Sequence, residues 1–228
     1  MDIASLDIKL IRQRPGSDDC LRACGLMAFK YYNDQITKIF LWNKLHVYKK
    51  HSGLIGSYVQ DLGIITLKRG YKSVIAHNDW QWWTQDVVDQ VQKGPKGLKS
   101  SLSTLEKEKK EWSDKKIIKK EIKFSELGGK LKFEIPKLST LDRLLISKIP
   151  IIIIVSSDDF YHQPIKGYCH TILIQGKTGD NYHILDPLYA TSKISSDELL
   201  YAWSRAGGWR ISFIPKVRDN NAQVKLNF

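Results

Sequence analysis

The chain is poor in cysteine and has no long apolar run. Only three of its 228 residues are cysteines, namely Cys20, Cys24 and Cys169. A small, odd number of cysteines excludes a framework of paired disulfides and is typical of reduced thiols. The longest apolar stretch, residues 149–155, is much shorter than the roughly 18 residues that a membrane-spanning helix needs. The sequence therefore predicts neither a disulfide-stapled protein nor a transmembrane one.

The N-terminus also lacks the basic start and the apolar core of a secretory signal peptide. We therefore expect a cytoplasmic protein, or one exported by a non-classical route as an effector. Hydrophobic residues make up 42% of the chain, which is enough for a sizeable core. Length and composition together predict a single domain over residues 1–228.

Acidic residues are too few to balance the basic ones, and the excess is unevenly distributed. The net charge is +12, and residues 93–132 contain 13 lysines, six acidic residues and no arginine. Lysine without arginine is typical of a solvated surface rather than of base recognition, which uses arginine forks. We therefore do not expect nucleic-acid recognition, although the field of this region could attract an anionic partner. A weak amphipathic pattern predicts a helical, lysine-rich insertion at about residues 94–132.

Predicted helices occupy most of the first two thirds of the chain, and the predicted strands, together with one more helix, occupy the last third. Helices are expected from the N-cap residues 17–19 to about 33, and over 35–50, 56–69, 79–92, 141–148 and 195–205. Strands are expected over 149–156, 168–175, 181–185 and 209–214, with a hairpin turn at 176–181. The order favours an α+β fold in which helices pack on an antiparallel sheet.

The helix predicted over residues 35–50 has five apolar or aromatic positions that we expect to be buried. They are Ile36, Ile39, Phe40, Trp42 and Leu45.

Three residues distant in the sequence form a candidate nucleophilic site. Cys20 falls in the first turn of its predicted helix, where unpaired N–H groups stabilise a thiolate. His170 lies on a predicted strand, and Asp186 ends the next strand, so a hairpin would place the carboxylate beside the imidazole. The imidazole would act as the base and the carboxylate would fix its tautomer. The Gln13 amide and the Cys20 N–H would be the donors to an oxyanion.

The other cysteines and histidines have simpler interpretations. Cys24 and Cys169 are interpreted as structural, because cysteine often behaves as a small apolar side chain. His162 and His183 are rival bases, but the first falls in a polar loop and the second has no obvious acid partner. Cys20 and Cys24 have no second ligand pair with zinc spacing, so we expect no metal and no other cofactor.

Several stretches carry a resemblance to a known family. They are Gln13, Asp19-Cys20, Ala23-Cys24, Met27 and Tyr31-Tyr32, then Gly167-Tyr168-Cys169-His170-Thr171-Ile172-Leu173-Ile174, Ile184-Leu185-Asp186-Pro187, Tyr201-Ala202-Trp203 and Gly207-Gly208-Trp209. In these stretches the chain resembles the papain-like cysteine peptidases. Within that group, it most resembles the bacteriocin-processing, double-glycine-leader peptidases and the papain-fold bacterial effectors.

The resemblance implies a papain-like fold, with the cysteine helix packed on a sheet that carries the histidine and the aspartate. It also implies Cys20 as nucleophile, His170 as base, Asp186 as its orienting acid and Gln13 as oxyanion donor. One departure is Leu21, because the family usually has glycine directly after the nucleophile.

The leading hypothesis is a cysteine protease that hydrolyses an amide bond in a peptide or protein through an acyl-thioester, without a cofactor. A glutamine deamidase and an acyl or γ-glutamyl transferase stay open, because both use the same triad and intermediate. A catalytically silent peptide-binding module is an alternative from another class. A further alternative is a nucleic-acid or anionic-membrane binder that acts through residues 93–132, with steeply salt-dependent binding.

Overall fold

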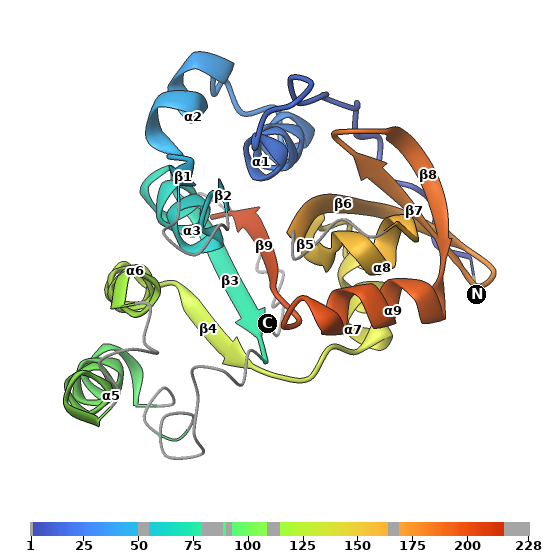
Figure 1. Ribbon diagram of the computed structural model, residues 1–228. Coiled ribbons are helices and arrows are strands. Elements are labelled where there is room, and N and C mark those ends of the chain that lie inside the picture. Colours follow the sequence, from blue (N-terminus) through green and yellow to red (C-terminus); the bar gives the residue numbers. More distant parts are fainter. Residues whose placement is uncertain are drawn as a thin grey trace, which may run out of the picture.

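A computed structural model describes residues 2–49, 55–78, 89, 93–108, 115–163 and 169–216 (Figure 1). Its helices are α1 Cys20–Tyr31, α2 Lys38–Lys44, α3 Val59–Lys68, α5 Gly94–Glu108, α6 Lys115–Glu126, α7 Leu138–Ile146, α8 Ser157–Tyr161 and α9 Ser196–Arg205. Its strands are β1 Tyr48–Lys49, β2 Ile55–Gly56, β3 Tyr71–His77, β4 Lys130–Phe133, β5 Ile151–Ser156, β6 Cys169–Thr178, β7 Asn181–Asp186, β8 Ala190–Ser195 and β9 Arg210–Pro215.

A seven-stranded sheet in the order β4-β3-β9-β5-β6-β7-β8 forms the centre of the molecule. Neighbouring strands in it are antiparallel, except for the parallel pair of β3 and β4. Strands β6 and β7 form a hairpin around Gly179 and Asp180, and β6 continues three residues beyond its predicted end. This hairpin brings the end of β7 back toward the start of β6.

The central strands are almost entirely apolar because helices cover both faces of the sheet. Ile151, Ile152, Ile153 and Val155 of β5 are all buried, and so are successive residues of β6. Such continuous apolar runs are typical of strands covered on both sides. Figure 1 shows α1 and α9 on opposite sides of β5 and β6.

Several helices and strands, most of them C-terminal, agree with the sequence prediction. Helix α9 begins with a capping box, in which the Ser195 hydroxyl accepts from the Glu198 N–H and the Glu198 carboxylate accepts from the Ser195 N–H. Helices α3 and α7 and strands β5, β6, β7 and β9 also lie where the sequence predicts them. The mixed α+β fold class is therefore confirmed.

The prediction for residues 35–50 is partly wrong. Helix α2 is shorter than expected, because it begins after the Thr37 cap and ends before β1. Ile36 and Leu45 are buried as predicted, but Ile39 is 74% exposed and Phe40 is 39% exposed. In the shorter helix Leu41 faces the core instead, so the two residues before it point toward solvent.

The sheet also contains strands that the sequence analysis did not predict. Strands β3 and β4 come from the middle of the chain, so the sheet is not purely C-terminal, and β8 and α8 were not predicted either. The lysine-rich insertion contains two helices, α5 and α6, and its last residues belong to β4. Figure 1 shows α5 and α6 beyond the β3–β4 end of the sheet. The helix predicted over residues 79–92 lies outside the described residues, apart from Asp89.

In the part of the chain that the structure describes, every helix is too short or too polar to span a bilayer.

Candidate active site

Cys20 is the first residue of α1, and its thiol lies close enough to His170 and Thr171 for both to lower its pKa. The first intrahelical hydrogen bond runs from the Ala23 N–H to the Asp19 carbonyl, so Cys20 lies in the turn where the helix begins. N–H groups at a helix start carry partial positive charge and stabilise an anion. The residue as a whole is partly exposed.

His170 and Asp186 form a buried pair across the β6–β7 hairpin. The His170 Nε2–H donates to Asp186 Oδ1 at 2.8 Å, and the two residues are 6% and 2% exposed. A carboxylate accepts only, so this bond places a proton on Nε2 and leaves Nδ1 as the nitrogen that can exchange a proton. The structure thus brings together three residues that the sequence separates by up to 166 positions.

The Asp186 carboxylate has two further donors. The Leu188 N–H donates to Oδ1 at 2.7 Å, and the Tyr161 hydroxyl donates to Oδ2 at 2.6 Å. Sequence reasoning missed Tyr161 because it did not predict α8. The signal available was the run Ser156–Asp159, which places acidic residues in a first helical turn.

The electrostatics of the three residues favour a charged thiolate and imidazolium. Burial raises the pKa of the Cys20 thiol, but the hydrogen bond and the positive charge of His170 outweigh it and lower that pKa below its ordinary value. Burial lowers the pKa of His170, yet its hydrogen bonds to Asp186 and Cys20 and their charges raise it to about 9. Burial also raises the pKa of Asp186, but His170 and Tyr161 reverse this effect and hold it below its usual range.

Gln13 lies between the loop before Cys20 and the loop after Asp186. Its backbone N–H donates to the Pro187 carbonyl at 2.9 Å, and its side-chain amide donates to the Ser17 carbonyl at 2.7 Å. Among the described protein atoms, its Oε1 is buried without a hydrogen-bond partner. One amide N–H is thus engaged with the nucleophile loop, and the second is available to another acceptor.

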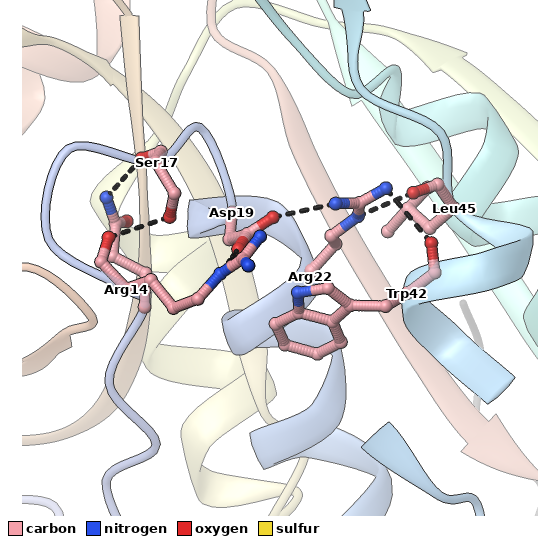
Figure 2. A network of polar contacts seen from close by, with 7 residues as sticks. Arg14, Ser17, Asp19, Arg22, Trp42 and Leu45 are labelled. Carbon is pink, nitrogen blue, oxygen red and sulfur yellow. Dashed lines mark hydrogen bonds and ion pairs between the residues drawn. The ribbon is translucent and has the colours of Figure 1, made fainter. Parts of the chain in front are cut away.

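An ionic network holds the loop before Cys20 against α2. The buried Asp19 carboxylate accepts from Arg22 at 2.7 Å and from Arg14 at 3.3 Å. Arg22 also donates to the carbonyls of Leu45 and Trp42, at 2.6 and 3.0 Å. Figure 2 shows the Arg22 guanidinium between Asp19 on one side and these two carbonyls on the other. Asp19 occupies the N-cap position of α1, but its side chain binds the two arginines and does not cap the helix.

Comparisons with known proteins agree with this architecture. By sequence, the chain matches no protein-family model and no curated protein. By structure, it is similar to a protein described as a C39-like peptidase of Bacillus anthracis, with a TM-score of 0.53, 13% identity and coverage of 95% of this chain and 98% of that one. The chain has the fold of the C39-like peptidases.

A second structure of this C39-like fold is similar as well. It is a double-glycine-motif protease from an AMS/PCAT transporter, solved in complex with a leader peptide. Its TM-score is 0.50 at 14% identity, over 95% of this chain and 99% of that one. Because these identities are low, the likeness describes the fold, and the chemistry has to be argued from the residues themselves.

The remaining cysteines lie outside the group formed by Cys20, His170 and Asp186. Cys24 is fully buried, and its thiol donates to the Thr171 carbonyl at 3.4 Å. Burial raises its pKa well above the ordinary value, and charge on Cys20 and Asp186 adds to the effect, so it stays a thiol. Cys169 is exposed, whereas its neighbour His170 is buried, as expected for adjacent residues on a strand.

The two rival histidines have other partners. The exposed His162 lies 3.6 Å from Glu198, and His183 hydrogen-bonds with Ser5 and Thr178. Within the described ranges, no group of three or more His, Cys, Asp or Glu residues is arranged to hold a metal ion.

Proposed function

We propose that this protein is a cysteine peptidase that hydrolyses an amide bond in a peptide or protein, with Cys20, His170 and Asp186 as its catalytic residues. One observation carries the proposal. A thiol at a helix start lies beside an imidazole whose charge lowers the pKa of that thiol, and the imidazole Nε2 lies 2.8 Å from a buried carboxylate. This arrangement provides an activated nucleophile, a proton carrier and a group that orients the carrier.

The reaction proceeds in two steps. The Cys20 thiolate attacks the carbonyl carbon, and the His170 imidazolium gives its proton to the departing amine nitrogen as the C–N bond breaks. This leaves an acyl-thioester and a neutral imidazole. His170 then takes a proton from water, the hydroxide attacks the thioester carbonyl, and the acid product leaves as the Cys20 thiolate returns.

The developing oxyanion needs hydrogen-bond donors. We assign this role to the Cys20 N–H and the second N–H of the Gln13 amide. The two hydrogen bonds of Gln13 to Ser17 and Pro187 support the assignment, because they hold it between the nucleophile loop and the loop after Asp186. Loss of one such donor costs about 10²–10³ in kcat.

Peptide or protein is the proposed substrate class. A structural neighbour was solved in complex with a leader peptide, which supports a peptide substrate for this chain. Nothing in the triad itself separates hydrolysis of a peptide bond from deamidation or acyl transfer, so the test has to identify the product.

Alkylation of Cys20 tests the triad without a known substrate. Trypsin places the three cysteines on separate peptides, namely residues 13–22, 23–30 and 167–177, so each adduct can be counted by mass spectrometry. We expect iodoacetamide to label Cys20 rapidly well below pH 8, and His170→Ala to slow this labelling. Cys169→Ala is the control and should label Cys20 like the wild type. Slow labelling of Cys20 with an ordinary thiol profile would overturn the proposal.

A product analysis tests the reaction. Incubation with a peptide mixture should yield new chain ends, and Cys20→Ala should lower the rate by on the order of 10⁴-fold or more. Release of ammonia without chain cleavage would indicate a deamidase, and adducts with an added amine would indicate a transferase. An activated thiol with no product from any of these substrates would favour a peptide-binding module.

A further inference from the structure

The Tyr161 hydroxyl contacts the carboxylate oxygen of Asp186 that does not bond with His170. Its hydroxyl donates to Oδ2 at 2.6 Å, whereas His170 and the Leu188 N–H both donate to Oδ1. Donors on Oδ1 alone would let the carboxylate rotate about its Cβ–Cγ bond. A donor on Oδ2 removes that freedom, so the three bonds together define the plane of the carboxylate.

The side chain of Tyr161 is itself held in place. It ends the short helix α8, and the following His162 adopts a left-handed conformation with φ of 52°, which stops the helix there. Its ring packs edge-on against Tyr189 at 4.9 Å between centroids and lies tilted beside His170 at 5.7 Å. Tyr161 therefore touches both members of the His–Asp pair, one through its hydroxyl and the other through its ring.

We propose that Tyr161 is a positioning residue that acts through Asp186 to keep His170 aligned with the Cys20 thiolate. The proposal rests on the proposed function, because it assumes that the thiolate and the imidazolium form the reactive pair. Tyr161 does not exchange a proton. Burial and the hydrogen bond to Asp186 raise the pKa of its hydroxyl, so the group stays a donor throughout the working pH range.

Tyr161→Phe removes the hydroxyl and keeps the ring, so it tests the hydrogen bond alone. We expect the rate of Cys20 alkylation at pH 6 to fall by about three- to tenfold, the effect typical of losing one hydrogen bond. The pH midpoint of labelling should move upward, because a less aligned imidazolium stabilises the thiolate less. The groups that face His170 in this measurement are Cys20 on α1, Asp186 on β7 and Tyr161 on α8.

Tyr182→Phe is a matched control. The Tyr182 hydroxyl also donates to a carboxylate, Asp142, at 2.5 Å, but this pair takes no part in the triad. The control should lower the thermal midpoint without changing Cys20 labelling. Cys24 is fully buried and reports on folding in every variant, since its tryptic peptide should stay unlabelled.

A double variant separates positioning from packing. In an Asp186→Ala background Tyr161 has lost the group through which it acts, so Tyr161→Phe should have no further effect on labelling. An equal slowing in both backgrounds would overturn the proposal, and so would wild-type labelling of Tyr161→Phe or labelling of Cys24 in that variant. In each of these cases rapid labelling of the wild-type Cys20 would leave the proposed function intact.

Discussion

At the scale of single residues, the candidate site depends on the electrostatic coupling of Cys20 to His170 and on the hydrogen bond from His170 to Asp186. Each residue shifts the pKa of the next, because all three are held close together with limited access to water. Burial by itself would shift each pKa toward the neutral form of the group. The opposite charge beside each group outweighs this effect. In the proposed reaction, the reactive form is therefore the ion pair of thiolate and imidazolium.

The rate of amide hydrolysis should depend on pH with two limbs. As pH falls through the lowered pKa of Cys20, the thiolate is protonated and the rate falls. As pH rises through the His170 pKa of about 9, the proton needed by the leaving amine is lost and the rate falls again. A kcat/KM profile would show both limbs. Alkylation needs the thiolate only, so its rate should rise to a plateau, and an alkaline fall in alkylation would contradict the assignment.

At the scale of secondary-structure elements, the site is assembled from α1, the β6–β7 hairpin and the segment before α1. The hairpin sets His170 against Asp186, and hydrogen bonds of Gln13 connect the N-terminal segment to both loops of the site. The network around Asp19 and Arg22 then sets the start of α1 against the end of α2. The orientation of Cys20 thus depends on contacts that do not touch its sulfur.

Arg22→Ala should destabilise the protein strongly. It would leave the buried Asp19 carboxylate without its main donor and would remove the Arg22 hydrogen bonds to the carbonyls of Trp42 in α2 and of Leu45, its C-cap. Breaking a buried pair in this way costs about 3 kcal/mol of unfolding free energy. Urea denaturation would measure this loss. Arg14→Ala is the control, because the Arg14 side chain is 69% exposed and its ion pair should contribute less than about 1 kcal/mol. Equal losses would show that Arg22 does not organise the network.

At the scale of the whole molecule, the lysine-rich insertion joins the body through the buried side of α6. Ile118 and Phe124 pack inward, and the buried Glu121 accepts from Gln60 at 3.0 Å and lies 3.3 Å from His77. Strand β4 then adds the insertion to the edge of the central sheet. We therefore expect residues 1–228 to unfold as a single unit, with coincident urea transitions by circular dichroism and tryptophan fluorescence. Separate transitions would indicate an independent insertion.

The close approach of α6 to α3 can be tested at Gly63. A Cβ atom there would lie 2.7 Å from the Phe124 ring and 2.9 Å from Ile75. Gly63→Ala should lower the unfolding free energy by about 1–3 kcal/mol, even though alanine favours the helix by about 1 kcal/mol. Thermal or urea unfolding would measure it. Gly56→Ala is the matched control, since a Cβ at Gly56 meets no atom within 4 Å, and it should be nearly neutral. An equally neutral Gly63→Ala would contradict the packing.

Much of the fold follows from local patterns in the sequence. The apolar run of β5 predicts a buried strand, and the Ser195 and Glu198 pair predicts the start of α9. In contrast, β3 was missed because its membership in the sheet depends on pairing with β9, which lies more than 130 residues later. The exposure of Ile39 also depends on where α2 begins. A different first residue changes which side chains of a short helix face the core.

The sequence by itself determined the order of Gln13, Cys20, His170 and Asp186 and the elements that carry the last three, because caps and apolar periods are local properties. Only the tertiary structure decided that Tyr161 donates a hydrogen bond to the Asp186 carboxylate and that Arg22 connects Asp19 to the end of α2. Those contacts join elements whose relative positions are set by the packing of the whole core. A hydrogen bond between side chains 25 residues apart leaves no periodic trace in the sequence, so it becomes visible only once the chain has folded.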